Sequence, residues 1–242
     1  MPVDEIERIR AAYKKRKNEE SLYSLFNPGQ LLMTQQLERA LLRVLADHGV
    51  TSLRDKRILE VGCGAGWRLQ QFINYGAQPE NLSAVDLQEN AILAAQAINP
   101  KIEYTCGNAE NLPFPDQSFH LILQFVVFTS ILHQEMKHNV AAEMLRVLQP
   151  TGFILWYDYY VSKPTNPDVK GIRRREIRDL FPNCMFEFHR VTLAPPLVRV
   201  IAPHSFLLCY LLEKIPWLCM HYLVVIRKKV PLKTDCRLEA SV

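Results

Sequence analysis

The sequence lacks the patterns that mark several large classes of protein. Its six cysteines form no CxxC pair and have no metal-like spacing with histidine, so neither a disulfide framework nor a zinc module is indicated. The first residues show no signal-peptide pattern, and we expect reduced thiols in a cytoplasmic protein. Internal repeats and low-complexity segments are also absent.

No stretch of the chain predicts a membrane span. The most apolar segment outside the core strands, 191–226, is interrupted by charges and prolines, so no window of about 18 residues is free of both. We expect a covered helix near 205–214 followed by a strand. The alternative is that this helix lies at a membrane interface or binds a partner, although we do not expect membrane contact.

Strong charge of one sign is also missing. The net charge is +4 and the pI is near 8.7, but the basic runs at 14–17, 173–175 and 227–229 are short. Because an RNA-binding enzyme more often has a pronounced basic face, we expect no nucleic-acid partner. The 242 residues, 48% of them hydrophobic, predict one large domain with an ample core.

What the chain does contain is an alternation of strand-like and helical patterns. Helical segments occupy residues 1–48, and apolar strand-like runs then alternate with helical runs up to about residue 181. Continuous apolar strands separated by helices predict an α/β fold with a Rossmann-like, mainly parallel seven-stranded sheet and helices on both faces. The last two strand-like runs, MFEFHRVTLA and HYLVVIRKK, predict an antiparallel C-terminal edge hairpin.

A glycine-rich turn follows the first of these strands. ILEVGCGAGW, at 58–67, carries glycines at 62, 64 and 66, and in an open parallel sheet such a turn faces the ligand. Trp67 stands where a dinucleotide fingerprint needs a small residue, and no GxxxxGK[ST] phosphate loop occurs. Asp86, at the end of the next strand, can accept two hydrogen bonds from ribose hydroxyls. Without a conspicuous cation for a diphosphate, the pattern favours a ribose ligand that is neutral or cationic.

Four segments together carry a family resemblance. ILEVGCGAG, AVDL, CGNAENLPFPDQSF and VLQPTGFIL, in this order and spacing, resemble the motifs of class I S-adenosylmethionine-dependent methyltransferases of the type 11 branch, over about residues 56–160. The resemblance implies S-adenosyl-L-methionine as cofactor, with Glu60 facing the methionine amino group, the glycine loop under the cofactor, Asp86 on the ribose and Asn108 beside adenine. The implied cofactor-binding residues are Glu60, Gly62, Cys63, Gly64, Gly66, Asp86, Leu87, Asn108, Ala109, Glu110 and Gln124.

Two positions depart from the family pattern. Asn108 stands where aspartate is frequent, yet an amide can still accept a hydrogen bond from the adenine amino group. His120 replaces an aspartate at a position that is more structural than catalytic. Cys63, inside the loop, is expected to pack rather than react, because no base accompanies it in the sequence. We expect an N-terminal helical cap at 1–50, a methyltransferase domain at 51–230 (cofactor half 56–160, substrate half 161–230) and a mobile tail at 231–242.

The candidate catalytic residues come from the loops after the fourth and fifth strands. His133 and Asp158 could act as a general base if the acceptor is an alcohol or a protonated amine; the alternatives are surface, structural or loop-capping roles. No acidic metal cluster is visible, so we expect metal independence. Substrate-lining candidates, for which plain packing is the alternative, are Tyr13, Tyr23, Phe26, Trp156, Tyr157 and Tyr159.

The methyl acceptor is less well specified. The C-terminal segments are similar to uncharacterised type 11 enzymes associated with bacterial secondary-metabolite and cell-surface sugar gene clusters, which favours O- or N-methylation of a small molecule in natural product biosynthesis. A lipid or quinone methyltransferase at a membrane surface and a catalytically silent cofactor-binding module are the alternatives. We expect a monomer or a homodimer.

Overall fold

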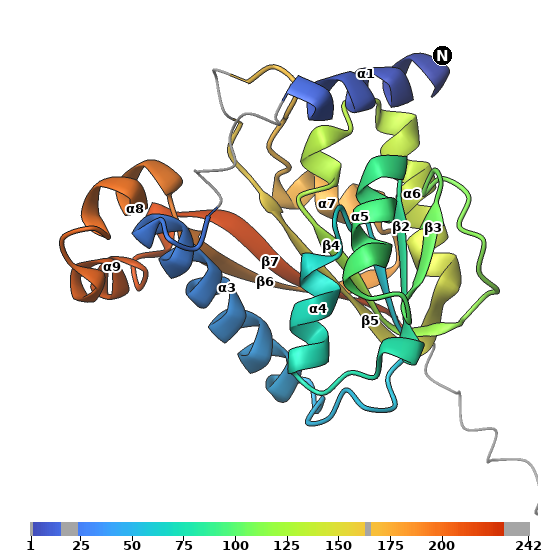
Figure 1. Ribbon diagram of the computed structural model, residues 1–242, viewed down its shortest axis with the longest axis horizontal. Coiled ribbons are helices and arrows are strands. Elements are labelled where there is room, and N and C mark those ends of the chain that lie inside the picture. Colours follow the sequence, from blue (N-terminus) through green and yellow to red (C-terminus); the bar gives the residue numbers. More distant parts are fainter. Residues whose placement is uncertain (1, 16–23, 163–165, 230–242) are drawn as a thin grey trace, which may run out of the picture.

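A seven-stranded sheet forms the centre of the molecule in the computed structural model, which describes residues 2–15, 24–162 and 166–229. The strand order is β3-β2-β1-β4-β5-β7-β6 (Figure 1). The five strands from β3 to β5 are parallel, whereas β7 is antiparallel to both β5 and β6. The strands are β1 Ile58–Val61, β2 Leu82–Asp86, β3 Glu103–Cys106, β4 Phe119–Phe125, β5 Leu148–Tyr159, β6 Cys184–Leu193 and β7 Cys219–Lys228.

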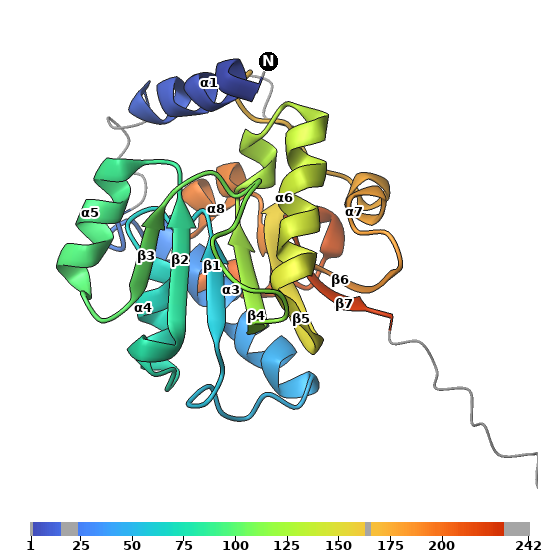
Figure 2. The same ribbon diagram turned by 90° about the vertical axis from the view of Figure 1, so that its right-hand side faces the viewer.

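Helices cover both faces of this sheet (Figure 2). On one face α3 (Pro28–Asp47) and α4 (Trp67–Asn74) bury leucine, valine and phenylalanine side chains against the strands, and α5 (Glu89–Ile98) adds Ile92. On the other face lie α6 (Gln134–Val147) and α7 (Arg174–Leu180). Because β1 and β4 are covered from both sides, they are apolar along their length apart from a few polar residues, which explains their continuous hydrophobic runs. The predicted fold is confirmed.

The N-terminal helices have two different positions. Helix α1 (Pro2–Lys15) lies across the carboxyl ends of the central strands (Figure 2), whereas α3 packs along a sheet face. Helix α3 begins at Asn27, whose Oδ1 accepts hydrogen bonds from the N–H groups of Gly29 and Gln30. The predicted cap therefore corresponds to α1, and the second helical segment is part of the layered core.

The C-terminal segment completes the sheet. The predicted hairpin is present, with β6 at the edge and β7 inserted between β6 and β5. Two short helices, α8 (Pro195–Ile201) and α9 (Phe206–Leu212), connect β6 to β7. The helix predicted near 205–214 is present as α9, but the expectation that it is covered is wrong, since Leu207 and Leu211 are exposed. Helix α8 was not predicted; it begins with Pro195 and Pro196, and proline fits the first turn of a helix, where its missing N–H has no partner to lose. No helix within the described ranges is long and apolar enough to cross a membrane. The tail at 231–242 lies outside the described residues.

Candidate functional site

The predicted cofactor-binding residues lie at the carboxyl edge of the parallel strands. The chain passes outward from β1 through β2 to β3 on one side and from β4 to β5 on the other, so the strand order reverses between β1 and β4. Loops that leave neighbouring strands in opposite directions open a crevice at this point, where ligands of such folds bind. The glycine turn follows β1 at this crevice, and Asp86 ends β2 beside it.

The three glycines of the turn have different environments. All have positive φ angles, +73° at Gly62, +54° at Gly64 and +78° at Gly66, a region that residues with a Cβ rarely adopt. A Cβ at Gly62 would clash with Val127, and one at Gly66 would meet the Tyr104 hydroxyl at 2.9 Å. A Cβ at Gly64 would meet no atom within 4 Å. Packing therefore accounts for two of the glycines, and Gly64 is the one that leaves space for a ligand.

Asp86 ties this turn to the next strand. Its Oδ2 accepts a hydrogen bond from Gly64 N at 2.8 Å, and its Oδ1 accepts one from Gln88 N, also at 2.8 Å. Burial raises the pKa of this carboxyl, and the backbone donors partly offset that rise. Each carboxylate oxygen keeps a second lone pair, so Asp86 can hold the turn and still accept from ribose hydroxyls.

Glu60 is a buried acid with an unused acceptor. Its side chain is 2% exposed, and burial raises its pKa to about 8, while the nearby charge of Arg68 acts to lower it. Its Oε2 has no hydrogen-bond partner among the described residues. A buried carboxylate oxygen without a donor is costly unless a ligand supplies one, so an ammonium group is the expected partner of Glu60.

Arg68, which sequence reasoning missed, lies beside this acid. Its guanidinium carbon is 4.3 Å from the centre of the Phe125 ring, and its Nε is buried without a hydrogen-bond partner among the described residues. Burial lowers its pKa, and Glu60 opposes that shift. A cation and an acid with unused polar atoms together suit the carboxylate and amine of an amino-acid moiety. The available signal was a cation two residues after the last glycine of the motif.

The loop after β3 carries the predicted adenine-binding residues. Asn108 Oδ1 accepts from Glu110 N at 3.0 Å, and Asn108 Nδ2 donates to Glu110 Oε2 at 2.8 Å. The other oxygen of Glu110 accepts from Asn139 Nδ2 of α6 at 2.8 Å. Glu110 thus stabilises the turn and links it to α6, so its side chain has a structural role whether or not adenine binds here.

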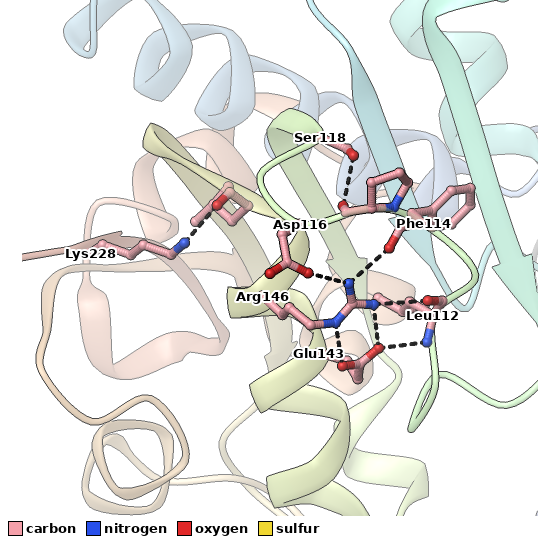
Figure 3. A network of polar contacts seen from close by, with 9 residues as sticks. Leu112, Phe114, Asp116, Ser118, Glu143, Arg146 and Lys228 are labelled. Atoms are coloured by element: carbon pink, nitrogen blue, oxygen red, sulfur yellow. Dashed lines mark hydrogen bonds and ion pairs between the residues drawn. The ribbon is translucent and has the colours of Figure 1, made fainter.

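An arginine on α6 fixes the remainder of this loop (Figure 3). Arg146 donates to the carbonyl oxygens of Leu112 and Phe114 at 2.9 and 2.8 Å, and pairs with Asp116 at 2.8 Å. Glu143 holds the same guanidinium at 2.7 Å and also accepts from Leu112 N at 2.7 Å. All three guanidinium nitrogens of Arg146 donate hydrogen bonds, and these bonds fix the conformation of the chain that follows Asn108.

A narrow cavity of about 60 Å³ lies between this loop, the glycine turn and α1. Predicted residues that line it are Gly62, Asp86, Leu87, Asn108, Ala109 and Tyr13. The sequence did not predict the contributions of Ile9, Ser130, Ile131, Met136 and Val140. They are apolar or small residues of α1, α6 and the preceding loop, and their side-chain types do not distinguish them from core residues. The lining does not include the other predicted cofactor-binding residues, which are Glu60, Cys63, Gly64, Gly66, Glu110 and Gln124.

Helix α1 is fastened over the cavity by charged side chains. Glu5 Oε1 accepts from the N–H groups of Leu132 and His133, at 2.6 and 3.3 Å, just before α6. Arg8 donates to the carbonyl of Ser130 at 2.6 Å and lies 3.6 Å from Asp168. The backbone donors and Arg8 lower the pKa of Glu5 against the opposing effect of burial, so the carboxylate stays charged.

The two candidate catalytic residues have different settings. His133 precedes α6, half-buried, with its N–H on Glu5. Asp158 is 1% exposed, and its oxygens accept from Thr129 N, Thr129 Oγ1 and Tyr159 N at 3.1, 2.7 and 2.9 Å. Burial raises the pKa of Asp158 to about 7, although these donors act to lower it. Asp158 lies within the last residues of β5 and not in the loop after it, and its hydrogen bonds link this strand end to the segment after β4. A catalytic role for either residue stays a prediction.

The predicted substrate-lining residues are dispersed. Tyr13 lines the cavity, but Phe26 is fully exposed at the start of α3, and Tyr23 lies outside the described residues. Trp156 is completely buried against Phe128, with ring centres 4.3 Å apart, which favours the packing alternative for it. The rings of Tyr157 and Tyr159 both contact the His221 ring, with distances between ring centres of 4.6 and 3.9 Å.

Three further residues singled out in the sequence are Cys63, Gln124 and His120. Burial raises the pKa of the Cys63 thiol, which keeps it protonated and agrees with a packing role. Gln124 is completely buried; its Oε1 accepts from Val127 N at 3.1 Å and so positions the side chain that covers Gly62. His120 lies at the opposite end of β4, where Nδ1 accepts from Arg57 N at 3.0 Å. Among the described residues, no group of three or more His, Cys, Asp or Glu could hold a metal ion, and metal independence stays a prediction.

Part of the chain is similar in sequence to known methyltransferases. Residues 58–152 match the family described as a methyltransferase domain. An uncharacterised protein of Haemophilus influenzae is 36% identical over 112 residues, which cover 43% of this chain and 43% of that protein. A phthiotriol/phenolphthiotriol dimycocerosates methyltransferase of Mycobacterium ulcerans is 33% identical over 116 residues, 47% of this chain and 40% of that protein. The matches thus span less than half the length of these curated relatives.

The fold itself has relatives of known structure. The crystal structure of geranyl diphosphate C-methyltransferase from Streptomyces coelicolor, in complex with S-adenosyl-L-homocysteine, superposes with a TM-score of 0.57 at 14% sequence identity. The superposition covers 81% of this chain and 82% of that one. At this identity the likeness concerns the fold alone.

Proposed function

Since residues 58–152 match a methyltransferase domain, we propose that the chain transfers a methyl group from S-adenosyl-L-methionine to a small-molecule acceptor. The acceptor atom is an oxygen or a nitrogen. The reaction belongs to natural product biosynthesis in the cytoplasm. One observation carries this proposal: Oε2 of Glu60, buried and without a donor among the described residues, faces an edge that also holds Gly64 and Asp86.

The residues of the crevice fit the three parts of the cofactor. Glu60 can accept from the ammonium of the methionine moiety, and Arg68 can donate to its carboxylate. The open space in front of Gly64 admits a ligand close to the backbone, and Asp86 has acceptor capacity for the ribose hydroxyls. Asn108 and Ala109 line the cavity where the adenine ring would lie.

When bound, the cofactor supplies a methyl group that its sulfonium sulfur makes electrophilic. The chain then has to align the acceptor, exclude water and, for an alcohol or an ammonium, take up one proton. Helix α1, held by Glu5 and Arg8, covers one side of the cavity through Ile9 and Tyr13. Of the two predicted bases we favour His133, which immediately precedes α6, because the carboxylate of Asp158 is enclosed by donors.

The proposal is tested by calorimetry followed by a transfer assay. The wild-type protein should bind S-adenosyl-L-methionine and S-adenosyl-L-homocysteine, and Glu60→Gln and Arg68→Met should each weaken binding by about 1.5–3 kcal/mol. Arg43→Met is the matched control, because Arg43 is an exposed arginine on α3 away from the crevice. A wild-type protein that binds neither ligand would exclude the function. Binding without labelled-methyl transfer to any acceptor in a broad screen would leave the catalytically silent module as the function.

A lipid acceptor is the second candidate. Two observations favour it: the mycobacterial relative is named for a dimycocerosate lipid, and apolar side chains are exposed on α9, at the same edge of the sheet as the crevice. Assays with detergent-dispersed lipids beside water-soluble alcohols and amines would distinguish the two acceptor classes by turnover.

A further inference from the structure

The connection between β6 and β7 exposes many large apolar side chains. We call this group the α8–α9 patch. Leu207 is 69% exposed, Leu211 is 56% exposed and Trp217 is 84% exposed. The residues of the patch are Val200, Phe206, Leu207, Leu208, Tyr210, Leu211, Ile215 and Trp217. Scattered apolar residues are normal on a protein surface, but so many within one connection indicate an interaction surface.

Helix α9 has its apolar face turned outward. Its buried residue is Cys209, and at 100° per residue Leu207 and Leu211 lie on the opposite side of the helix. Ser205 Oγ caps the start of the helix by accepting from Leu208 N at 3.1 Å, and Cys209 packs the helix onto the protein in a small buried cluster with Leu32, Leu193 and Val198. A firmly packed helix with leucines directed to solvent differs from the usual amphipathic pattern, in which the polar face is exposed.

The patch lies at the end of the molecule where the site opens. Helix α8 leaves β6 and the connection re-enters the sheet at β7, where His221 pairs with Tyr159 at the carboxyl end of β5. Figure 1 shows α8 and α9 projecting beyond this end of β6 and β7. Tyr160, next to the end of β5, donates from its hydroxyl to the Cys219 carbonyl at 2.7 Å. The patch and the candidate site therefore share one edge of the sheet.

Positive charge borders the patch. Between residues 195 and 219 the one acidic residue is Glu213, and Arg39 binds both of its oxygens, at 2.9 and 2.8 Å. Arg199 and Lys214 are exposed, and Lys214 Nζ lies 4.5 Å from the centre of the Tyr210 ring. Lys214 Nζ also lies 3.5 Å from Glu213 Oε1, so the single acid lies between two cations, and with Arg199 three positive charges stand against one negative charge.

We propose that the α8–α9 patch docks onto the surface of an anionic lipid bilayer. Exposed leucines, with Tyr210 and Trp217 among them and the cations Arg199 and Lys214 on the same connection, are the residue types that lie in the interface between headgroups and acyl chains. A second copy of the chain would bring Arg199 and Lys214 against the same cations, whereas anionic headgroups neutralise them. Helices of this length lie on a bilayer and do not span it.

Vesicle co-sedimentation tests the surface directly. The full chain is mixed with vesicles of phosphatidylcholine alone or of phosphatidylcholine with phosphatidylglycerol, and the bound fraction is measured. Wild-type protein should bind the anionic vesicles more tightly than the neutral ones. Leu207→Asp and Leu211→Asp should each lower binding at least about tenfold, because each removes an inserted apolar side chain. Arg199→Glu and Lys214→Glu should lower binding to anionic vesicles about fivefold each or more.

Leu93→Asp is the matched control, since Leu93 is an exposed leucine on α5, outside the patch, and its substitution should leave vesicle binding unchanged. Circular dichroism and calorimetric binding of S-adenosyl-L-homocysteine verify that each variant is folded and that the candidate site is intact. Membrane docking and methyl transfer are separate properties, so loss of cofactor binding by the wild-type protein would contradict the proposed function and leave vesicle binding untouched.

Three results would overturn the membrane proposal. Wild-type protein could stay in the supernatant with both vesicle types. Leu207→Asp and Leu211→Asp could bind as the wild type does. Sedimentation velocity could show a dimer that Leu211→Asp dissociates, without vesicle binding, and the occupant of the patch would then be a second copy of the chain.

Discussion

The backbone N–H of Gly64 donates to Oδ2 of Asp86 at 2.8 Å, so one side chain at the end of β2 holds the turn that follows β1. The other oxygen of Asp86 holds the turn after β2 through Gln88. The expected ribose ligand is therefore also the residue that shapes the space beneath the cofactor. Binding and turn geometry cannot be separated at this position, and its substitution should affect both.

Asp86→Ala should weaken binding of S-adenosyl-L-homocysteine by about 1.5–3 kcal/mol, the usual value for hydrogen bonds to a charged group. Calorimetry measures the change. Asp86→Asn keeps an acceptor for Gly64 N and should lose less. Asp55→Ala removes an exposed aspartate away from the crevice and should have no effect. An affinity unchanged by Asp86→Ala would mean that the cofactor does not bind at this strand end.

Gly64→Val should abolish cofactor binding in a protein that still folds. The φ of +54° makes any side chain at Gly64 unfavourable by about 1–2 kcal/mol, and the new methyl groups would fill the open space in front of the turn. Gly49→Val is the matched control, because Gly49 also has a positive φ, +73°, and open surroundings, but follows α3 far from the crevice. Both variants should lose similar stability in denaturant unfolding, and only the first should lose binding. Equal binding by the two would show that no ligand approaches Gly64.

The pKa of Glu60, raised by burial from 4.5 to about 8, predicts a pH dependence of stability. The folded state holds a proton that the unfolded chain releases above pH 4.5, so this contribution to stability is complete below pH 4.5 and is lost as the pH rises through about 8. Glu60→Gln removes the titration, and relative to wild type its free energy of unfolding should therefore rise from pH 5 to pH 8, by on the order of 1 kcal/mol or more.

Comparison of the two proteins at each pH isolates Glu60. Burial lowers the pKa of His221 from 6.5 to about 3, which acts in the opposite direction, because a histidine that is neutral in the folded state favours folding as the pH rises. Wild type and Glu60→Gln both contain His221, so its contribution cancels in the difference between their free energies of unfolding. A difference between them that is constant from pH 5 to pH 8 would show that Glu60 titrates at its ordinary pKa.

Replacement of the two candidate bases should separate their roles. If the acceptor is a hydroxyl and His133 removes its proton, His133→Ala should lower turnover by about 10² to 10⁴ at nearly constant cofactor affinity. Asp158→Asn should show the same loss only if Asp158 is the base, and Thr129→Val controls for the hydrogen bond that Asp158 loses. Retention of most turnover by both variants would indicate an acceptor that is already deprotonated or intrinsically nucleophilic.

Arg146→Met should lower the free energy of unfolding by about 1–3 kcal/mol, since it leaves two carbonyls and two carboxylates without their donor (Figure 3). It should also weaken cofactor binding, because the loop that carries Asn108 loses its fixed course. Denaturant unfolding and calorimetry measure the two effects, with the exposed Arg43→Met as control. A stability loss without a change in affinity would show that the loop from 108 to 118 is not part of the site.

Much of the fold was determined by the sequence alone, since it depends on local pattern. Apolar runs such as ILEV and LILQF, separated by helical periods, predicted the parallel sheet, and the last two runs predicted its antiparallel edge. The glycine turn and the strand-end Asp86 were equally visible, because positive φ angles and a carboxylate at a strand end are requirements of single residues. Helix α8 was not predicted, although its N-terminal proline pair is favourable in a first helical turn.

The tertiary structure decided which polar groups are satisfied. Nothing in the sequence distinguishes Asp158, enclosed by donors from Thr129 and Tyr159, from Glu60, whose Oε2 has no donor among the described residues. Arg68 lies near Glu60, and Glu5 accepts a hydrogen bond from the backbone just before α6. Both contacts join separate elements and therefore depend on how those elements pack. Burial and hydrogen bonding are properties of neighbours brought together by folding, and residue types along the chain do not specify them.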